Sequence, residues 1–158
     1  MESRLDFTKH SSDGLNALYA MEKYLSRCGL DHKLMLLVKM RASQINGCAY
    51  CLDMHSKDAR ALGETEQRLY ALNAWQETPF FNERERAALA WTETLTLVSQ
   101  THVPDSAFEE VRKQFSEKEL MDLTYLAASI NSWNRLAISL RAVPGTYKSS
   151  AAAAAKSS

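Results

Sequence analysis

Residues 41–60, RASQINGCAYCLDMHSKDAR, contain two of the three cysteines and one of the four histidines of the chain. Cys48, Cys51 and His55 follow the spacing C-x-x-C-x-x-x-H. In a helix, side chains three and four positions apart share a face, so these three groups should point the same way. Two thiols at this spacing can join as a disulfide, and the histidine can exchange a proton with the second thiol. The stretch therefore predicts a redox site on a helix.

The composition is that of a single globular domain. The chain has 158 residues, of which 46% are hydrophobic and 24% charged, and its formal net charge is zero. This length can bury a proper core, and the neutral balance argues against nucleic acid or an anionic membrane surface as a partner. The start MESRLDFTKHSSDG lacks the pattern of a signal peptide, and no run approaches the ~18 apolar residues of a membrane span. We therefore expect a cytoplasmic protein with no nucleic-acid or membrane partner.

Helical spacing dominates the chain outside the motif. Apolar residues recur every three or four positions over residues 15–28, and Gly29 follows as a stop signal. Comparable patterns predict helices at residues 33–44, 47–62, 66–76, 82–103, 105–111 and 116–143. The prediction is an all-α fold: one compact domain of about six or seven helices over residues 1–147, followed by a low-complexity, alanine-rich tail at residues 148–158.

Several helix ends carry capping signals. Asn46 should cap the helix of the motif, which would put Cys48 in its first turn and Gly63 just beyond its end. Unpaired N–H groups and the helix dipole favour a thiolate at such a position. Asn82 and Ser116 each precede a glutamate by three positions, which is the pattern of a capping box.

The CxxC pair admits three interpretations. A zinc site needs further ligands, but the remaining cysteine and histidines, Cys28, His10, His32 and His102, are scattered and form no second pair. The second interpretation is that both are inert core cysteines. A single free cysteine is often buried in this way, but a pair at the start of a helix fits this interpretation less well. In a reducing compartment a CxxC pair is more often catalytic or metal-binding than a structural staple. We therefore favour a dithiol–disulfide couple, with Cys28 standing outside it.

Such a couple has a defined chemistry. A thiolate attacks the O–O bond of a peroxide, which gives a sulfenic acid and releases an alcohol or water. The second cysteine condenses with the sulfenic acid to a disulfide, which a separate reductant reopens. His55, four residues after Cys51, is positioned to take the Cys51 proton or to stabilise its thiolate.

Over roughly residues 15–142 the sequence resembles the alkylhydroperoxidase D-like, carboxymuconolactone decarboxylase superfamily, in its CxxC-containing peroxidase-like branch. The resemblance is carried by QINGCAYCLDMHSKDAR, GETEQRLYAL, WQETPFF, ERERAALAWTE and INSWNRLAI. It implies an all-helical fold that forms homo-oligomers (dimers, trimers or hexamers) and a thiol-dependent, peroxiredoxin-type peroxidase activity. In that family the second cysteine is peroxidatic and the first resolving, so the resemblance gives these roles to Cys51 and Cys48, and the relay to His55.

The substrate that the resemblance implies is a small-molecule hydroperoxide. The implied cofactor is the redox-active Cys48–Cys51 disulfide, without metal, haem or flavin, and a dithiol protein regenerates it.

The chain departs from the family pattern at two positions. Leu36 stands where characterised peroxidases carry a relay glutamate, and Tyr50 stands where they can carry a histidine. Losing a general base costs on the order of 10²–10⁴-fold in rate, so a weak peroxidase or a different thiol reaction is expected. The spacing does not select a substitute among the nearby acids, which are Asp53, Asp58 and Glu64. Arg41 and Arg60 flank the site and could lower a thiol pKa, although solvated charges are more common.

Two alternatives remain open. The first is a non-catalytic, redox-responsive oligomer in which Leu36 marks a degenerate relay. The second is an enzyme similar to carboxymuconolactone decarboxylase, and we rank it lower because that branch lacks the CxxC pair.

Overall fold

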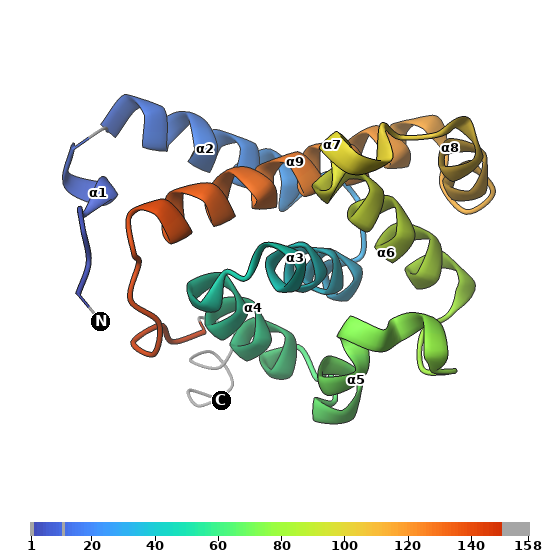
Figure 1. The fold of residues 1–158 in the computed structure, drawn as a ribbon, viewed down its shortest axis with the longest axis horizontal. Coiled ribbons are helices and arrows are strands. Elements are labelled where there is room, and N and C mark those ends of the chain that lie inside the picture. Colours follow the sequence, from blue (N-terminus) through green and yellow to red (C-terminus); the bar gives the residue numbers. More distant parts are fainter. Residues whose placement is uncertain (1, 11, 150–158) are drawn as a thin grey trace.

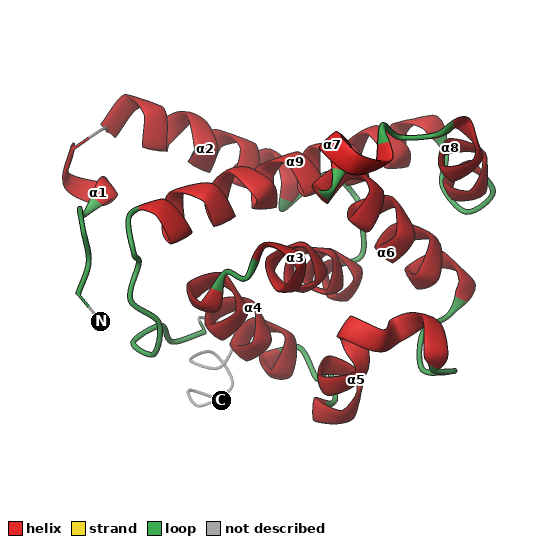
Figure 2. Cartoon of the chain, in the orientation of Figure 1, coloured by secondary structure: helices red, strands yellow, loops and turns green. Residues whose placement is uncertain are grey.

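The computed structural model describes residues 2–10 and 12–149, and over this part of the chain all regular elements are helices (Figure 2). They are α1 (Phe7–His10), α2 (Ser12–Leu25), α3 (His32–Asn46), α4 (Ala49–Ala61), α5 (Glu66–Ala71), the 3-10 helix η1 (Leu72–Glu77), α6 (Glu83–Thr96), α7 (Val98–Thr101), α8 (Asp105–Arg112) and α9 (Glu117–Ser139). The all-α fold class predicted from the sequence is confirmed.

Helix α3 lies at the centre of the fold, and α4, α6 and α9 all pack against it (Figure 1). Helix α2 runs beside α9, and α8 lies at the far end of the molecule, against α6 and α9. Because α3 is enclosed on several sides, its C-terminal end has a fixed position, and α4 starts from that end.

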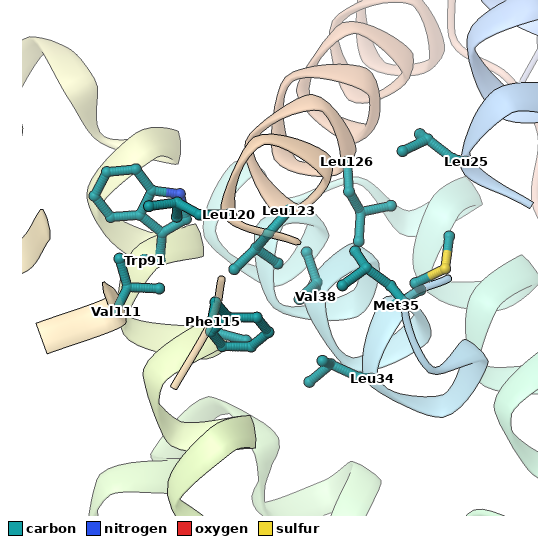
Figure 3. Packing of buried hydrophobic residues seen from close by; sticks show 12 residues of the cluster. Leu25, Leu34, Met35, Val38, Trp91, Val111, Phe115, Leu120, Leu123 and Leu126 are labelled. Carbon is teal, nitrogen blue, oxygen red and sulfur yellow. The ribbon is translucent and has the colours of Figure 1, made fainter. Parts of the chain in front are cut away.

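Apolar side chains on several faces of α3 form the core. Leu34, Met35 and Val38 face α9, together with side chains from α6 and α8 (Figure 3). Leu37 and Met40 face the other way, into a cluster with residues of α5, η1 and α6. Each fully buried side chain of this size stabilises the fold by about 1.5–3 kcal/mol, so the burial of these side chains anchors α3 firmly in the fold.

A third buried cluster surrounds the cysteines themselves. Cys48 and Cys51 pack with Ala42 of α3 and with Ile130 and Ala137 of α9. The CxxC motif therefore lies inside the helix packing rather than on an exposed loop.

The predicted capping boxes at Asn82 and Ser116 are confirmed. In each, the cap side chain accepts from the N–H of the third helical residue, Glu85 or Glu119, and that glutamate accepts from the N–H of the cap residue. These local signals alone are enough to locate the starts of α6 and α9.

The predicted cap at Asn46 is wrong. Asn46 is the last residue of α3, Gly47 follows in the left-handed conformation at φ 71°, and Cys48 is the N-cap of α4. The Asn46 side chain does not cap α4 because it donates hydrogen bonds to Asn131 and Asn134 of α9 instead. Gly63 does follow the end of α4, with φ 82°, as predicted.

Three other predicted boundaries differ from the structure. The helix expected over residues 66–76 turns into 3-10 geometry at Leu72. The helix expected over residues 82–103 is interrupted at Leu97, which has φ −100° and ψ 30°. The last long helix ends at Ser139 rather than near Pro144, because Arg141 takes a positive φ of 55° and the Ala142 N–H donates back to Ala137.

The described part of the C-terminal segment lies against α4. The Gly145 N–H donates to Asp53, and the Tyr147 hydroxyl donates to Asp58. Residues 150–158 of the predicted alanine-rich tail lie outside the described residues. Among the described helices, none combines the length and the apolar character needed to cross a lipid bilayer.

Candidate active site

The two cysteines of the motif lie at the start of α4, and both are buried. Cys48 is the N-cap residue and Cys51 lies in the first turn, with exposed fractions of 1% and 2%. The backbone N–H of Cys51 donates to the Cys48 sulfur at 3.4 Å, and the two thiols lie close enough to shift each other's pKa. Both are free thiols in this structure.

Hydrogen bonds separate the acidities of the two thiols. The pKa of Cys48 is lowered to about 7, first because the Cys51 thiol donates to its sulfur and also because backbone N–H groups stabilise the thiolate. The pKa of Cys51 is raised, first because its proton is held by Cys48 and then because the thiol is buried. The pair therefore loses one proton near neutral pH and retains the other. A thiolate is the form of cysteine that attacks oxidants.

His55 lies one turn after Cys51 and is almost fully buried, with an exposed fraction of 6%. Burial and, after it, the positive charge of Lys39 lower its pKa to about 3, and the negative charge of Glu22 opposes this shift. Its Nδ1 atom is buried without a hydrogen-bond partner. The imidazole is therefore neutral at physiological pH and has a nitrogen that can take a proton.

A cavity of about 210 Å³ opens beside these residues. Residues of α1, α2, α3, α4 and α9 line it, and most of them are aromatic or aliphatic. They are Phe7, Thr8, Tyr19, Glu22, Lys39, Tyr50, Cys51, Met54, His55, Trp133 and Ala137. Cys51 and His55 line the cavity together, whereas Cys48 is absent from its lining. A molecule in the cavity would thus meet the Cys51 sulfur first.

Glu22 of α2 is a cavity residue that the sequence analysis missed. Its carboxylate pairs with Lys39 Nζ at 2.6 Å, and it accepts hydrogen bonds from Ser129 Oγ at 2.7 Å and Trp133 Nε1 at 3.1 Å. Burial alone would raise the pKa of Glu22, but the Lys39 charge and these donors lower it, so the group is a carboxylate at neutral pH. A sequence signal existed, because Glu22 lies four positions after Leu18 and three before Leu25 and so falls on the apolar face of its helix.

The acids proposed from the sequence as substitutes for a relay glutamate lie elsewhere. Asp53 pairs with Lys57, Asp58 accepts from Tyr147, and Glu64 pairs with Arg68, all outside the cavity of Cys51. Leu36 packs against the apolar cluster on the other side of α3 and does not line this cavity.

The two arginines that flank the motif in sequence are also engaged elsewhere. Arg41 pairs with Glu93 at 2.7 Å, and Arg60 pairs with Glu66 at 3.3 Å. The main causes of the lowered Cys48 pKa come from other residues of the site.

Behind the cysteines lies a buried polar network. The Asn134 side chain donates to Ser43 Oγ at 3.0 Å, and both residues interact with the motif cysteines. Asn134 also accepts from Asn46 at 2.8 Å, which links the end of α3 to α9. Within residues 2–10 and 12–149, no three His, Cys, Asp or Glu side chains gather into a group that could hold a metal ion.

Comparison with known proteins shows the family to which this chain belongs. Residues 12–94 match the model of the carboxymuconolactone decarboxylase family. Over 140 residues, the chain is 41% identical to the uncharacterized protein YdfG of Bacillus subtilis, covering 89% of this chain and 95% of that protein. The chain belongs to the carboxymuconolactone decarboxylase family.

Solved structures place it among alkylhydroperoxidase D-like folds. A crystal structure from Agrobacterium tumefaciens superposes with a TM-score of 0.89 at 39% identity, covering 92% of this chain and 100% of that one. That protein is of unknown function and is described as a candidate antioxidant defence protein AhpD. The debrominase Bmp8 superposes with a TM-score of 0.74 at 23% identity, covering 86% of this chain and 73% of Bmp8, a likeness that shows the fold alone.

Proposed function

We propose that this chain is a thiol peroxidase, which reduces an organic hydroperoxide through the Cys48–Cys51 couple. The observation that carries the proposal is a buried thiol pair whose second sulfur, Cys51, lines an apolar cavity beside a neutral histidine. Family membership and the alkylhydroperoxidase D-like fold support the same class of chemistry.

Access to the cavity favours Cys51 as the attacking sulfur. Cys48 is the more acidic thiol, but the cavity lining includes only Cys51 of the two. Because the titrations of the two thiols are coupled, a proton can pass from Cys51 to Cys48, which leaves the charge on Cys51. His55 provides a second acceptor for the Cys51 proton.

The reaction proceeds in three balanced steps. The Cys51 thiolate attacks one peroxide oxygen, the O–O bond breaks, and the alkoxide takes a proton, which leaves Cys51 as a sulfenic acid and releases an alcohol. The Cys48 thiol then attacks the Cys51 sulfur and expels water, which forms the disulfide. A dithiol reductant protein transfers two electrons and two protons to reopen the disulfide.

Cysteine variants test these roles. Turnover of an organic hydroperoxide is measured with a dithiol as the recycling reductant, and a 1,3-diketone probe reports sulfenic acid. Cys51→Ser should abolish turnover because the attacking sulfur is gone. Cys48→Ser should stop after one turnover and accumulate the sulfenic acid, which no second thiol can resolve.

Cys28→Ser is the matched control, because Cys28 packs in the apolar cluster between α2 and α3, away from the cavity, and its replacement should leave turnover unchanged. Wild-type turnover by Cys51→Ser would contradict the assignment. Absence of turnover in the wild type, with thiols inert to peroxide, would favour the redox-responsive or decarboxylase-like alternatives.

A further inference from the structure

Two side chains of opposite charge, Glu22 and Lys39, lie in the wall of the otherwise largely apolar cavity that Cys51 and His55 line. Their side chains are 26% and 12% exposed, so solvent screens their charges weakly. Taking two charges out of water costs free energy, and apolar residues of similar volume often stabilise a helix interface as well or better. Helix packing alone therefore does not explain why the Glu22–Lys39 ion pair lies in this cavity wall.

The position of the Glu22 carboxylate is fixed from two other helices. Lys39 of α3 donates to Oε2 at 2.6 Å, while Ser129 and Trp133 of α9 both donate to Oε1, at 2.7 and 3.1 Å. A carboxylate held by three donors cannot swing away when a charge forms nearby. It supplies a negative charge at a constant place in the cavity wall.

His55 is the group in this cavity that such a charge affects. When the Cys51 proton moves to His55, an imidazolium forms in a buried site next to the cation Lys39, and both burial and Lys39 oppose it. Glu22 is the one carboxylate among the described residues that line the cavity. The titratable groups that share the cavity with His55 are Tyr19 and Glu22 on α2, Lys39 on α3, and Tyr50 and Cys51 on α4.

We propose that Glu22 is a positioning residue of this site, whose carboxylate neutralises Lys39 and stabilises the imidazolium that His55 forms when it takes the Cys51 proton. The inference rests on the proposed function and adds a proton path to it. The Cys51 proton moves to His55, the thiolate attacks the hydroperoxide, and the S–O bond forms as the O–O bond breaks. The imidazolium then gives its proton to the departing alkoxide, so His55 returns to its neutral form and an alcohol leaves.

The first test compares Glu22→Gln with a matched control, Glu93→Gln. Like Glu22, Glu93 accepts hydrogen bonds from a cation, Arg41, and from a tryptophan, Trp75. Its side chain is 23% exposed, which is similar to Glu22, but Glu93 lies outside the cavity. Glu22→Gln should lower kcat/KM for the hydroperoxide by about ten- to a hundredfold, less than the loss of a general base itself. Glu93→Gln should stay within about twofold of wild type, while both variants keep helical circular dichroism. An equal loss in the two variants would overturn the proposal.

The second test requires no catalysis, so it separates this inference from the proposed function. Proton NMR follows the titration of the His55 ring, identified by the signal that disappears in His55→Asn. Lys39→Met should raise the pKa of His55, because the opposing cation is gone while Glu22 remains. Adding Glu22→Gln to Lys39→Met should lower the pKa again. Identical His55 titrations in the single and double variants would overturn the charge coupling, even in a protein with full peroxidase activity.

Discussion

At the scale of single residues, the site depends on a histidine that is buried in its neutral form. His55 has no partner for Nδ1, and burial lowers its pKa from an ordinary 6.5 to about 3. The unfolded chain therefore binds a proton below pH 6.5 that the folded chain does not bind. Linkage then requires that stability falls as the pH falls from 6.5 towards 3.

This linkage predicts the pH dependence of unfolding. One pKa unit corresponds to about 1.4 kcal/mol, so His55 should lower the free energy of unfolding by about 2 kcal/mol between pH 6.5 and pH 5. In His55→Asn this component should be absent, and the variant should lose less stability on acidification than wild type. Urea unfolding at pH 7.5 and pH 5 measures the difference, with His10→Asn, at an exposed position, as the control. Equal pH dependence in wild type and His55→Asn would contradict a buried neutral histidine.

The residues of the motif were accessible to sequence reasoning because their relation is local. Helical spacing brings Cys51 and His55 to the same cavity, and Cys48 lies beside Cys51 as the N-cap of α4; their catalytic roles stay predictions. For Glu22 the sequence shows only that it falls on the apolar face of its helix. It is far from the motif in sequence, and its place in the cavity depends on how α2 packs against α9, which that local pattern does not determine.

At the scale of elements, Gly47 joins α3 to α4 and decides where the cysteines point. Its φ of 71° lies in the left-handed region, and its N–H donates back to the end of α3. This turn lets Cys48 become the N-cap of α4, with its sulfur facing the N–H of Cys51.

Replacing Gly47 tests the importance of this turn. Nothing lies within 4 Å of an added Cβ, so Gly47→Ala should cost only the left-handed conformation, about 1–2 kcal/mol in the free energy of unfolding. Gly47→Asn should cost less, because asparagine tolerates this region better. Urea denaturation of both variants measures the order. An alanine variant as stable as wild type would show that the turn can relax without loss.

Helix ends show where sequence reasoning works at this scale. The capping boxes at Asn82 and Ser116 were predicted because both partners lie within four residues of each other. The cap at Asn46 was predicted wrongly because its side chain bonds instead to α9, some 85 residues away in sequence. Local signals thus locate a helix start, but they cannot report a competing partner from another helix.

At the scale of the whole molecule, the fold packs helices around the thiol pair, and a largely apolar cavity opens beside it. Helix α3 is the centre of the packing, and the cavity forms where α1, α2, α3, α4 and α9 meet. Helical spacing in the sequence predicted the all-α class. The arrangement of the helices was implied by the family resemblance and not by physical reasoning from the residues. Assembly into homo-oligomers and a reductant partner stay predictions.

The most direct test of the peroxidase proposal is a single turnover of the pre-reduced wild-type protein with an organic hydroperoxide, followed by peptide mass spectrometry. The account predicts that each chain consumes one equivalent of hydroperoxide, loses two thiols, and contains a disulfide between Cys48 and Cys51, with Cys28 still reduced. Unchanged hydroperoxide with all thiols intact, or a disulfide that includes Cys28, would contradict it.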